Sequence, residues 1–167
     1  NNNSYNKILV TKNGKKGIVD ANTYQIVCPI DYDEIWLRYV ECTKVRKNNL
    51  WGVFDIKQNK LIMPTQYTYV EFDTETNLFC CQKDNNWVFI DATLKQIAQM
   101  PYNSEESIKP LNLNLFLVTN NTTSEKQVVN NKGELQFRIT NPAYQQIFSY
   151  QDGVSRIRLT DQTFYFI

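Results

Sequence analysis

The chain has 167 residues, of which 42% are hydrophobic and 13% are aromatic, so we expect a folded domain with a real core and exclude disorder. Eighteen basic and seventeen acidic residues leave a net charge of +1, which excludes the concentrated positive surface that nucleic acid binding needs. No apolar run reaches the roughly 20 residues of a membrane-spanning helix, so membrane insertion is not expected. The sequence begins at Asn1 without a Met or a leader, which fits a mature secreted form or an excised fragment and leaves the compartment open.

Five β-hairpins are predicted in chain order, because short apolar runs alternate with polar turn residues. They are residues 8–10 with 17–19, 40–45 with 51–54, 78–81 with 87–90, 113–118 with 128–129, and 154–159 with 164–167. The turns are assigned to Asn-rich pairs, since Asn tolerates the left-handed backbone region. These pairs are Asn13-Gly14, Asn48-Asn49, Asn85-Asn86 and Asn130-Asn131. The segment 103–109 is predicted to be a loop.

One strand motif recurs at a nearly fixed interval. Gly17-Ile18-Val19-Asp20 returns as Trp51-Gly52-Val53-Phe54-Asp55, then as Trp87-Val88-Phe89-Ile90-Asp91, and weakly as Val128-Val129-Asn130. The last residues of these copies are 35, 36 and 39 positions apart. Such a period is typical of a structural unit stacked on copies of itself, because one unit cannot bury its apolar face alone. We expect a single domain with repeats at about 7–38, 39–73, 74–111 and 112–150 and a closing hairpin at 151–167.

A second signature follows the motif strand. Pro29 and Tyr32 match Pro64 and Tyr67 at an offset of 35 residues, each pair coming after an apolar run. The fourth copy keeps Pro142 and Tyr144, whereas the third keeps only Met100-Pro101 and then departs. Proline has no amide to donate, so we expect it to end the strand and begin a corner. The tyrosine is expected to pin that corner by burying its ring while its hydroxyl reaches backbone or water.

These two half-motifs together resemble the WG repeat of bacterial proteins, which is named for the pair seen here as Trp51-Gly52. The resemblance covers residues 7 to 167 and is strongest in the first two copies. It implies a β-rich repeat domain that acts as a scaffold or interaction unit, and it implies no common enzymatic activity. We therefore expect an all-β array of about four hairpin repeats of roughly 36 residues plus a closing hairpin. An open, twisted stack is favoured, with an incomplete propeller-like ring as the alternative.

The residue types that common enzymes need are mostly missing. Histidine is absent, which excludes Ser-His-Asp and Cys-His constellations and His-based zinc sites within this chain. No Gly-rich phosphate loop occurs. The cysteines form no C-x-x-C pair and are interpreted as small apolar fillers, although a disulfide between Cys42 and Cys80 or Cys81 stays open. The four cysteines are Cys28, Cys42, Cys80 and Cys81. We expect no enzyme, no metal and no cofactor.

Acidic residues gather after the motif strands. The groups are Asp31, Asp33 and Glu34 after the first copy and Glu71, Asp73 and Glu75 after the second. They are interpreted as solvated loops, with a calcium site or a carboxylate hydrolase as alternatives. The repeated Asp20, Asp55 and Asp91 are expected to accept turn amides, because each ends a strand. The alternative is a row of carboxylates that binds a ligand. Asn130 weakens this alternative, because the fourth copy has no charge at that position.

Aromatic and basic residues supply the candidate contact surface. Trp51 and Trp87 share one register and are predicted to stack in neighbouring repeats as core. Trp36 falls outside that register beside Arg38 and Tyr39, a composition typical of interface hot spots. Arg156 and Arg158 alternate on one strand and form either a further contact or a solvated face.

The sequence thus predicts a non-enzymatic protein-interaction or scaffold module of a bacterial protein, with an unidentified protein partner. A carbohydrate- or calcium-binding surface domain and an immunity protein against a bacterial toxin are the alternatives. A small-molecule or glycan ligand is left open.

Overall fold

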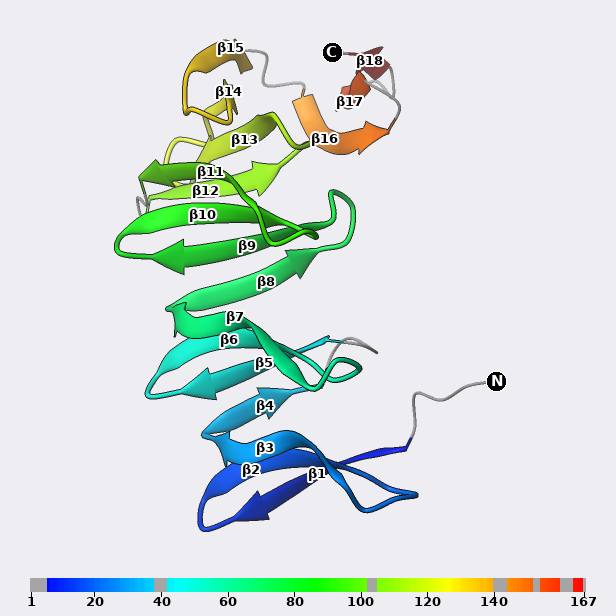
Figure 1. The fold of residues 1–167 in the computed structure, drawn as a ribbon. Helices are drawn as coiled ribbons and strands as arrows, with labels where there is room; N and C mark the ends of the chain where they lie inside the picture. The colour runs from blue at the N-terminus through cyan, green and yellow to red at the C-terminus, as the bar shows by residue number, and fades with distance from the viewer. Residues whose placement is uncertain are drawn as a thin grey trace. The chain divides into compact units, whose positions relative to one another are not determined.

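The computed structural model describes residues 6–37, 42–101, 105–139, 144–151, 154–159 and 164–166, with side chains described up to residue 139. The regular structure in these ranges is entirely β, and eighteen strands form five antiparallel sheets that follow one another along the chain (Figure 1). A search of the same residues finds no helix long and apolar enough to cross a membrane.

Each sheet is a meander of strands adjacent in sequence. The first sheet contains β1 (Lys7–Lys12), β2 (Lys15–Asp20) and β3 (Ile26–Tyr32). The second contains β4 (Glu34–Trp36), β5 (Cys42–Lys47), β6 (Leu50–Asp55) and β7 (Lys60–Tyr67). The third contains β8 (Tyr69–Asp73), β9 (Leu78–Lys83), β10 (Asn86–Asp91) and β11 (Gln96–Pro101). The fourth contains β12 (Glu106–Pro110), β13 (Leu115–Asn120), β14 (Lys126–Asn130) and β15 (Leu135–Ile139). The fifth contains β16 (Tyr144–Gln151), β17 (Val154–Leu159) and β18 (Phe164–Phe166).

The predicted all-β hairpin array is confirmed. The five predicted hairpins are the pairs β1–β2, β5–β6, β9–β10, β13–β14 and β17–β18. The second to fifth sheets each begin with a strand that the sequence did not predict. These strands are β4, β8, β12 and β16. The expected repeat boundaries therefore differ from the sheet boundaries by about one strand. The loop prediction for 103–109 is wrong from Glu106 onward, because β12 pairs with β13 along its whole length. The choice between an open stack and a ring stays a prediction.

The chain divides into two compact units, residues 1–70 and 71–167. In the first unit, a buried cluster joins the first and second sheets, and it consists of Ile18, Cys28, Tyr32, Ile35, Val45, Phe54 and Ile56. In the second unit, a cluster joins the third and fourth sheets, and it consists of Cys80, Phe89, Ala98, Met100, Phe116, Val118 and Val129. The fourth sheet also buries Leu111, Leu117 and Val128. Successive strand residues point to opposite faces, so Leu117 and Val128 lie on the face opposite Phe116 and Val129.

Three hairpin turns have two residues in the left-handed region, as expected for tight turns that match the twist of antiparallel strands. They are Asn13-Gly14 (φ 51° and 77°), Asn48-Asn49 (53° and 64°) and Asp84-Asn85 (49° and 57°). The prediction is thus confirmed for the first two turns and shifted by one residue in the third, where Asn86 already belongs to β10. After β14 the left-handed residue is Gly133 rather than Asn131.

The glycine of the motif lies beneath the proline of the second signature. A Cβ atom added to Gly52 would lie 2.5 Å from the Met63 carbonyl oxygen and 2.9 Å from the backbone of Pro64. The pairing explains this approach, since Trp51 pairs with Tyr67 and Val53 pairs with Met63, leaving three residues of β7 opposite the single glycine. Gly17 has the same relation to Ile30, whose Cα would be 2.8 Å from an added Cβ.

The proline therefore does not end the strand, and that part of the prediction is wrong. Pro29 lies within β3 and Pro64 within β7, each in a bulge after which pairing resumes at Tyr32 or Tyr67. A bulge tolerates proline because its residues leave the hydrogen-bonded ladder. The predicted burial of both tyrosine rings is confirmed, and Gln66 Nε2 donates to the Tyr67 hydroxyl at 3.1 Å.

The third copy shows what happens without the glycine. Val88 occupies the glycine position, and it pairs regularly with Gln99 between the pairs Trp87–Met100 and Phe89–Ala98. A side chain at this position excludes the overlying bulge, so β11 pairs regularly from Ala98 to Pro101, and its register shift lies further along, between Phe89 and Ile90 of β10. In the fourth copy, Tyr144 begins β16 but its side chain is not described, and Pro142 lies outside the described residues.

The repeated aspartates hold the turns that follow their strands, as predicted. Asp20 Oδ1 accepts the amides of Asn22 and Thr23, both at 3.0 Å. Asp55 Oδ1 accepts the amide of Gln58, and Asp91 Oδ1 accepts the amides of Thr93 and Lys95. In the fourth copy, the Asn130 side-chain oxygen accepts the amides of Lys132 and Glu134. Asparagine can replace aspartate here because the turn requires an acceptor and not a charge.

Asp20 makes stability depend on pH. The Lys7 ammonium, 2.6 Å away, and the turn amides hold the pKa of Asp20 well below its ordinary value of 3.8. A depressed folded-state pKa gives stability that is present above the unfolded-state pKa and lost as pH falls toward the folded-state value. We expect the melting temperature of the wild type to fall as pH is lowered below about 4.

An Asp20→Asn variant should be less stable than the wild type at pH 7, and the difference should shrink at low pH. The variant retains the turn acceptor, as Asn130 does, and loses only the charge. Thermal unfolding of both proteins followed by circular dichroism from pH 7 to pH 2 tests this expectation. Parallel curves for the two proteins would contradict it.

Candidate functional site

Four side chains of the second sheet form a cluster on one face, which we call the tryptophan cluster: Trp36, Lys44, Arg46 and Trp51. Strand pairing brings them together, because Trp36 lies opposite Lys44 and Arg46 lies opposite Trp51. Residues directly opposite each other in antiparallel strands project to the same face. The cluster therefore follows from the register of β4, β5 and β6.

The two tryptophan rings meet edge to face, with centroids 5.8 Å apart and an interplanar angle of 81°. This arrangement directs the positive edge of one ring toward the negative face of the other. The Lys44 ammonium lies 5.0 Å from the Trp36 centroid and 5.6 Å from the Trp51 centroid. Arg46 Cζ lies 5.4 Å from the Trp51 centroid. Both cations thus favour the observed ring positions through cation–π attraction.

Lys44 is the most buried member of the cluster, with 7% of its surface exposed. Burying an ammonium group is costly unless it has partners. Its Nζ donates to the Val70 carbonyl oxygen at 2.9 Å, and the two indole rings supply further stabilisation. The Lys44 ammonium group therefore stabilises the packing of the two indole rings from the buried side.

Trp36 is the exposed member, with 47% of its surface accessible. Its carbonyl oxygen accepts a 2.7 Å hydrogen bond from the Thr43 hydroxyl, which ties the end of β4 to β5. Glu34 at the other end of β4 pairs with Arg46. The tryptophan is thus held by contacts of its backbone and its ring while about half of its surface stays accessible. The role of Trp36 as a contact residue stays a prediction, and its contact with Trp51 was not predicted.

Trp51 and Trp87 occupy equivalent strand positions, but the prediction that both are core residues is wrong. Both are half-buried and have different neighbours. Trp51 contacts Trp36, whereas Trp87 stacks on Phe89 with centroids 6.1 Å apart and packs against the cluster between the third and fourth sheets. The difference arises across the strands, where Trp51 has Arg46 opposite and Trp87 has Gln82.

The other predicted contact residues cannot be added to the cluster. Arg38 and Tyr39 lie outside the described residues. Arg156 and Arg158 lie at alternate positions of β17, opposite Phe166 and Phe164, and their side chains are not described.

The acidic residues are committed to ion pairs and turns. Asp33 pairs with Lys15, Asp31 with Lys47, and Glu75 with Lys109 at 3.1 Å. The Lys15 ammonium lowers the pKa of Asp33. Asp73 Oδ1 accepts the amides of Glu75 and Thr76, so it closes a turn as the repeated aspartates do. Across the described ranges, no group of three or more potential metal ligands comes together.

The cysteines are reduced thiols and do not pair with one another. Cys28, Cys80 and Cys81 are buried and Cys42 is half-buried, and all four lie in the described part of the chain. Burial raises the pKa of Cys28 and of Cys80 to about 12 and also raises that of Cys81. These three thiols are therefore protonated at neutral pH and are poor nucleophiles.

Comparison with known proteins assigns the chain to no family. No family model matches it, and no curated protein matches it. A eukaryotic initiation factor is 9% identical with a TM-score of 0.49, over 98% of this chain and 49% of that chain. Hsv2 from Kluyveromyces lactis is 12% identical with a TM-score of 0.43, over 98% of this chain and 60% of that one. BamB from Moraxella catarrhalis is 10% identical with a TM-score of 0.34, over 98% of this chain and 67% of that one.

This chain therefore spans about half to three-fifths of the length of the first two solved chains. At these identities and TM-scores the likeness carries no statement about function. The class that the coordinates define is an all-β array of antiparallel hairpin repeats.

Proposed function

We propose that this chain is a non-enzymatic, protein-binding repeat module of a bacterial protein and that the tryptophan cluster is its partner contact. The observation that carries the proposal is Trp36, a half-exposed indole fixed by Trp51 and Lys44. Tryptophan and arginine dominate interface hot spots, because a rigid aromatic contributes a large contact area with little loss of conformational entropy. The Glu34–Arg46 ion pair supplies polar groups beside that ring.

The non-enzymatic part of the proposal is supported by the chemistry of the side chains. The sequence contains no histidine, and three of its four cysteines are buried thiols with raised pKa values. Five of the six candidate carboxylates for acid–base work, those of Asp31, Asp33, Glu34, Asp73 and Glu75, are occupied by lysine, by arginine or by turn amides.

We further propose that the chain belongs to the WG repeats. The geometry of the first two copies supports this assignment, because Gly17 and Gly52 leave room for the bulges that contain Pro29 and Pro64. The two half-motifs thus describe one physical contact.

Replacing Trp36 with alanine tests the partner contact. We expect at least a tenfold loss of affinity for the physiological partner, because truncating a hot-spot aromatic costs about 2 kcal/mol or more of binding free energy. The change also removes the aromatic pair and a cation–π contact, so the first unit should lose about 1–2 kcal/mol of its free energy of unfolding and remain folded.

The measurement is capture of proteins from the source bacterium on immobilised wild type and variants, followed by titration of the captured protein. Tyr24→Ala is the matched control, because Tyr24 is a more exposed aromatic of the same unit and lies outside the cluster. A partner retained by Trp36→Ala as strongly as by Tyr24→Ala would refute the proposed contact. Unfolding of the first unit in Trp36→Ala would assign the residue to the core instead.

A further inference from the structure

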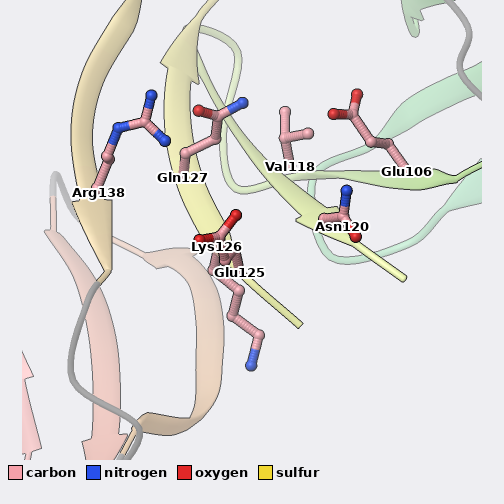
Figure 2. Close-up of a pocket in the computed structure, with 7 residues that line it drawn as sticks. All are labelled: Glu106, Val118, Asn120, Glu125, Lys126, Gln127 and Arg138. Atoms are coloured by element: carbon pink, nitrogen blue, oxygen red, sulfur yellow. The ribbon is translucent and has the colours of Figure 1, made fainter. Parts of the chain in front are cut away.

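A polar pocket of about 210 Å³ lies on the fourth sheet, in the second unit (Figure 2). Each of the four strands of that sheet contributes to its lining: Glu106 from β12, Val118 and Asn120 from β13, Gln127 from β14 and Arg138 from β15. The register explains why these side chains converge. Val118 lies opposite Gln127, Gln127 lies opposite Arg138, and Glu106 lies opposite Asn120.

The pocket continues the face of the sheet that buries Phe116, Val118 and Val129. Along β13 and β14 this face changes from apolar to polar, since Asn120 follows Val118 and Gln127 precedes Val129 at intervals of two. Polar residues at core-facing positions give up packing energy, so they need a compensating role.

Opposite charges occupy the two ends of the pocket. Glu106 is on one outer strand and Arg138 on the other, and three inter-strand spacings together with a two-residue offset along the strands place their backbones about 16 Å apart. Within the described ranges, neither residue enters an ion pair, although five other pairs occur there. Figure 2 shows the Arg138 guanidinium directed toward Gln127 and the Glu106 carboxylate standing beyond Val118.

The side-chain amide of Asn120, which lies between these charges, has a fixed orientation. The Asn120 side-chain oxygen already accepts the amides of Thr122 and Thr123, at 2.9 and 2.8 Å. Its NH2 group therefore remains as a donor toward the pocket, and Figure 2 shows that nitrogen on the side of Glu106 and Val118. The amine of Lys126 points away from the other lining side chains.

We propose that this pocket binds a small zwitterion whose ammonium and carboxylate groups are several bonds apart, such as a di- or tripeptide. Arg138 would receive the carboxylate through two parallel N–H···O bonds, and Glu106 would receive the ammonium group. Asn120 and Gln127 would hydrogen-bond the central amide. An extended peptide of two to three residues is about 7–10 Å long, which suits charges carried inward from the outer strands by their side chains.

Charge and lining favour this class over the other small ligands. With the Lys126 amine directed away, the charged lining consists of two acidic residues, Glu106 and Glu125, and Arg138. An anion alone would leave both acidic residues without a cation, and a cation alone would leave Arg138 unpaired. The described residues that line the pocket include no aromatic ring on which a sugar could stack.

The test is isothermal titration of the full chain with glycylglycine and triglycine. We expect dissociation constants between about 0.1 and 1 mM, since the pocket is open to water and the ligand is small. N-acetylglycylglycine lacks the ammonium group and glycylglycinamide lacks the carboxylate, so each should bind at least tenfold more weakly. Equal binding of either blocked peptide, or no binding of any peptide, would overturn the proposal.

Two variants of lining residues test whether the peptide binds in this pocket. Arg138→Gln and Glu106→Gln should each weaken binding of the better peptide at least tenfold, because each removes one charge partner while keeping a polar group. Lys132→Gln is the matched control, since Lys132 is an exposed residue of the turn between β14 and β15 and does not line the pocket. Binding unaffected by both pocket variants would place the ligand elsewhere and overturn the assignment.

The result is independent of the proposed protein contact. Trp36→Ala should leave peptide binding unchanged, and Arg138→Gln should leave capture of the partner unchanged. Thus failure of one proposal does not imply failure of the other.

Discussion

A Gly52→Ala variant is expected to lose about 3 kcal/mol of the free energy of unfolding of the first unit, from a change of a single methyl group. The added Cβ would lie 2.5 Å from the Met63 carbonyl oxygen and 2.9 Å from the Pro64 carbonyl carbon and the Thr65 nitrogen. These are backbone atoms, so no side-chain rotation relieves the contact. Relief requires the bulge of β7 to move, although it is anchored on both sides by the pairs Trp51–Tyr67 and Val53–Met63.

Urea unfolding followed by tryptophan fluorescence measures this loss, because Trp36 and Trp51 both lie in the first unit. Gly14→Ala is the control, since an added Cβ there meets nothing within 4 Å and only the positive φ of 77° opposes it. That control should lose about 1 kcal/mol. Gly17→Ala should resemble Gly52→Ala, because its Cβ would lie 2.8 Å from the backbone of Ile30. Equal losses of unfolding free energy for Gly52→Ala and Gly14→Ala would show that the bulge of β7 can move at little cost, which would contradict this prediction.

The second large effect concerns the core of the second unit. Phe89 is fully buried, and its ring centroid lies 4.5 Å from that of Phe116 across the third and fourth sheets. Truncating such a ring removes its burial and leaves a cavity that rigid sheets cannot close. We expect Phe89→Ala to cost about 3–5 kcal/mol and to shift the emission of Trp87, which stacks on Phe89.

Two companion variants make the Phe89 result interpretable. Phe89→Leu should cost less than Phe89→Ala, because it refills most of the volume. Leu113→Ala should change stability by less than about 0.5 kcal/mol, since Leu113 is a 51% exposed residue of the same unit. A loss below about 1 kcal/mol for Phe89→Ala would mean that the two sheets do not depend on this contact.

The sequence predicts the hairpins and their turns well because these depend on neighbouring residues. A turn such as Asn48-Asn49 carries its own backbone preference, and Asp20 or Asp91 reaches only amides a few positions ahead. Short leading strands such as β4 were missed for the opposite reason. Three residues contain no periodic signal, and Glu34–Trp36 forms a strand only through its pairing with β5.

The candidate sites were also hard to predict, because they depend on pairing between strands that are distant in sequence. The sequence could single out Trp36 as a candidate contact residue from its neighbours and register, whereas its contact with Trp51 requires the alignment of β4, β5 and β6. The pocket of the fourth sheet, which we propose as a zwitterion site, joins Glu106 and Arg138 from the outer strands of one sheet, and no local motif links them. Only the register of the whole meander makes them neighbours of one ligand.

The contact between glycine and bulge has a consequence for how the repeats diverge from a common ancestor. In the first two copies, a residue larger than glycine at this position would clash with the backbone of the facing bulge, so the glycine and the bulge depend on each other. The third copy fits this constraint, since it has Val88 and no bulge in β11 opposite that residue. In the third copy, the glycine and the bulge opposite it are therefore lost together, although the two positions are more than ten residues apart in the sequence of the first two copies.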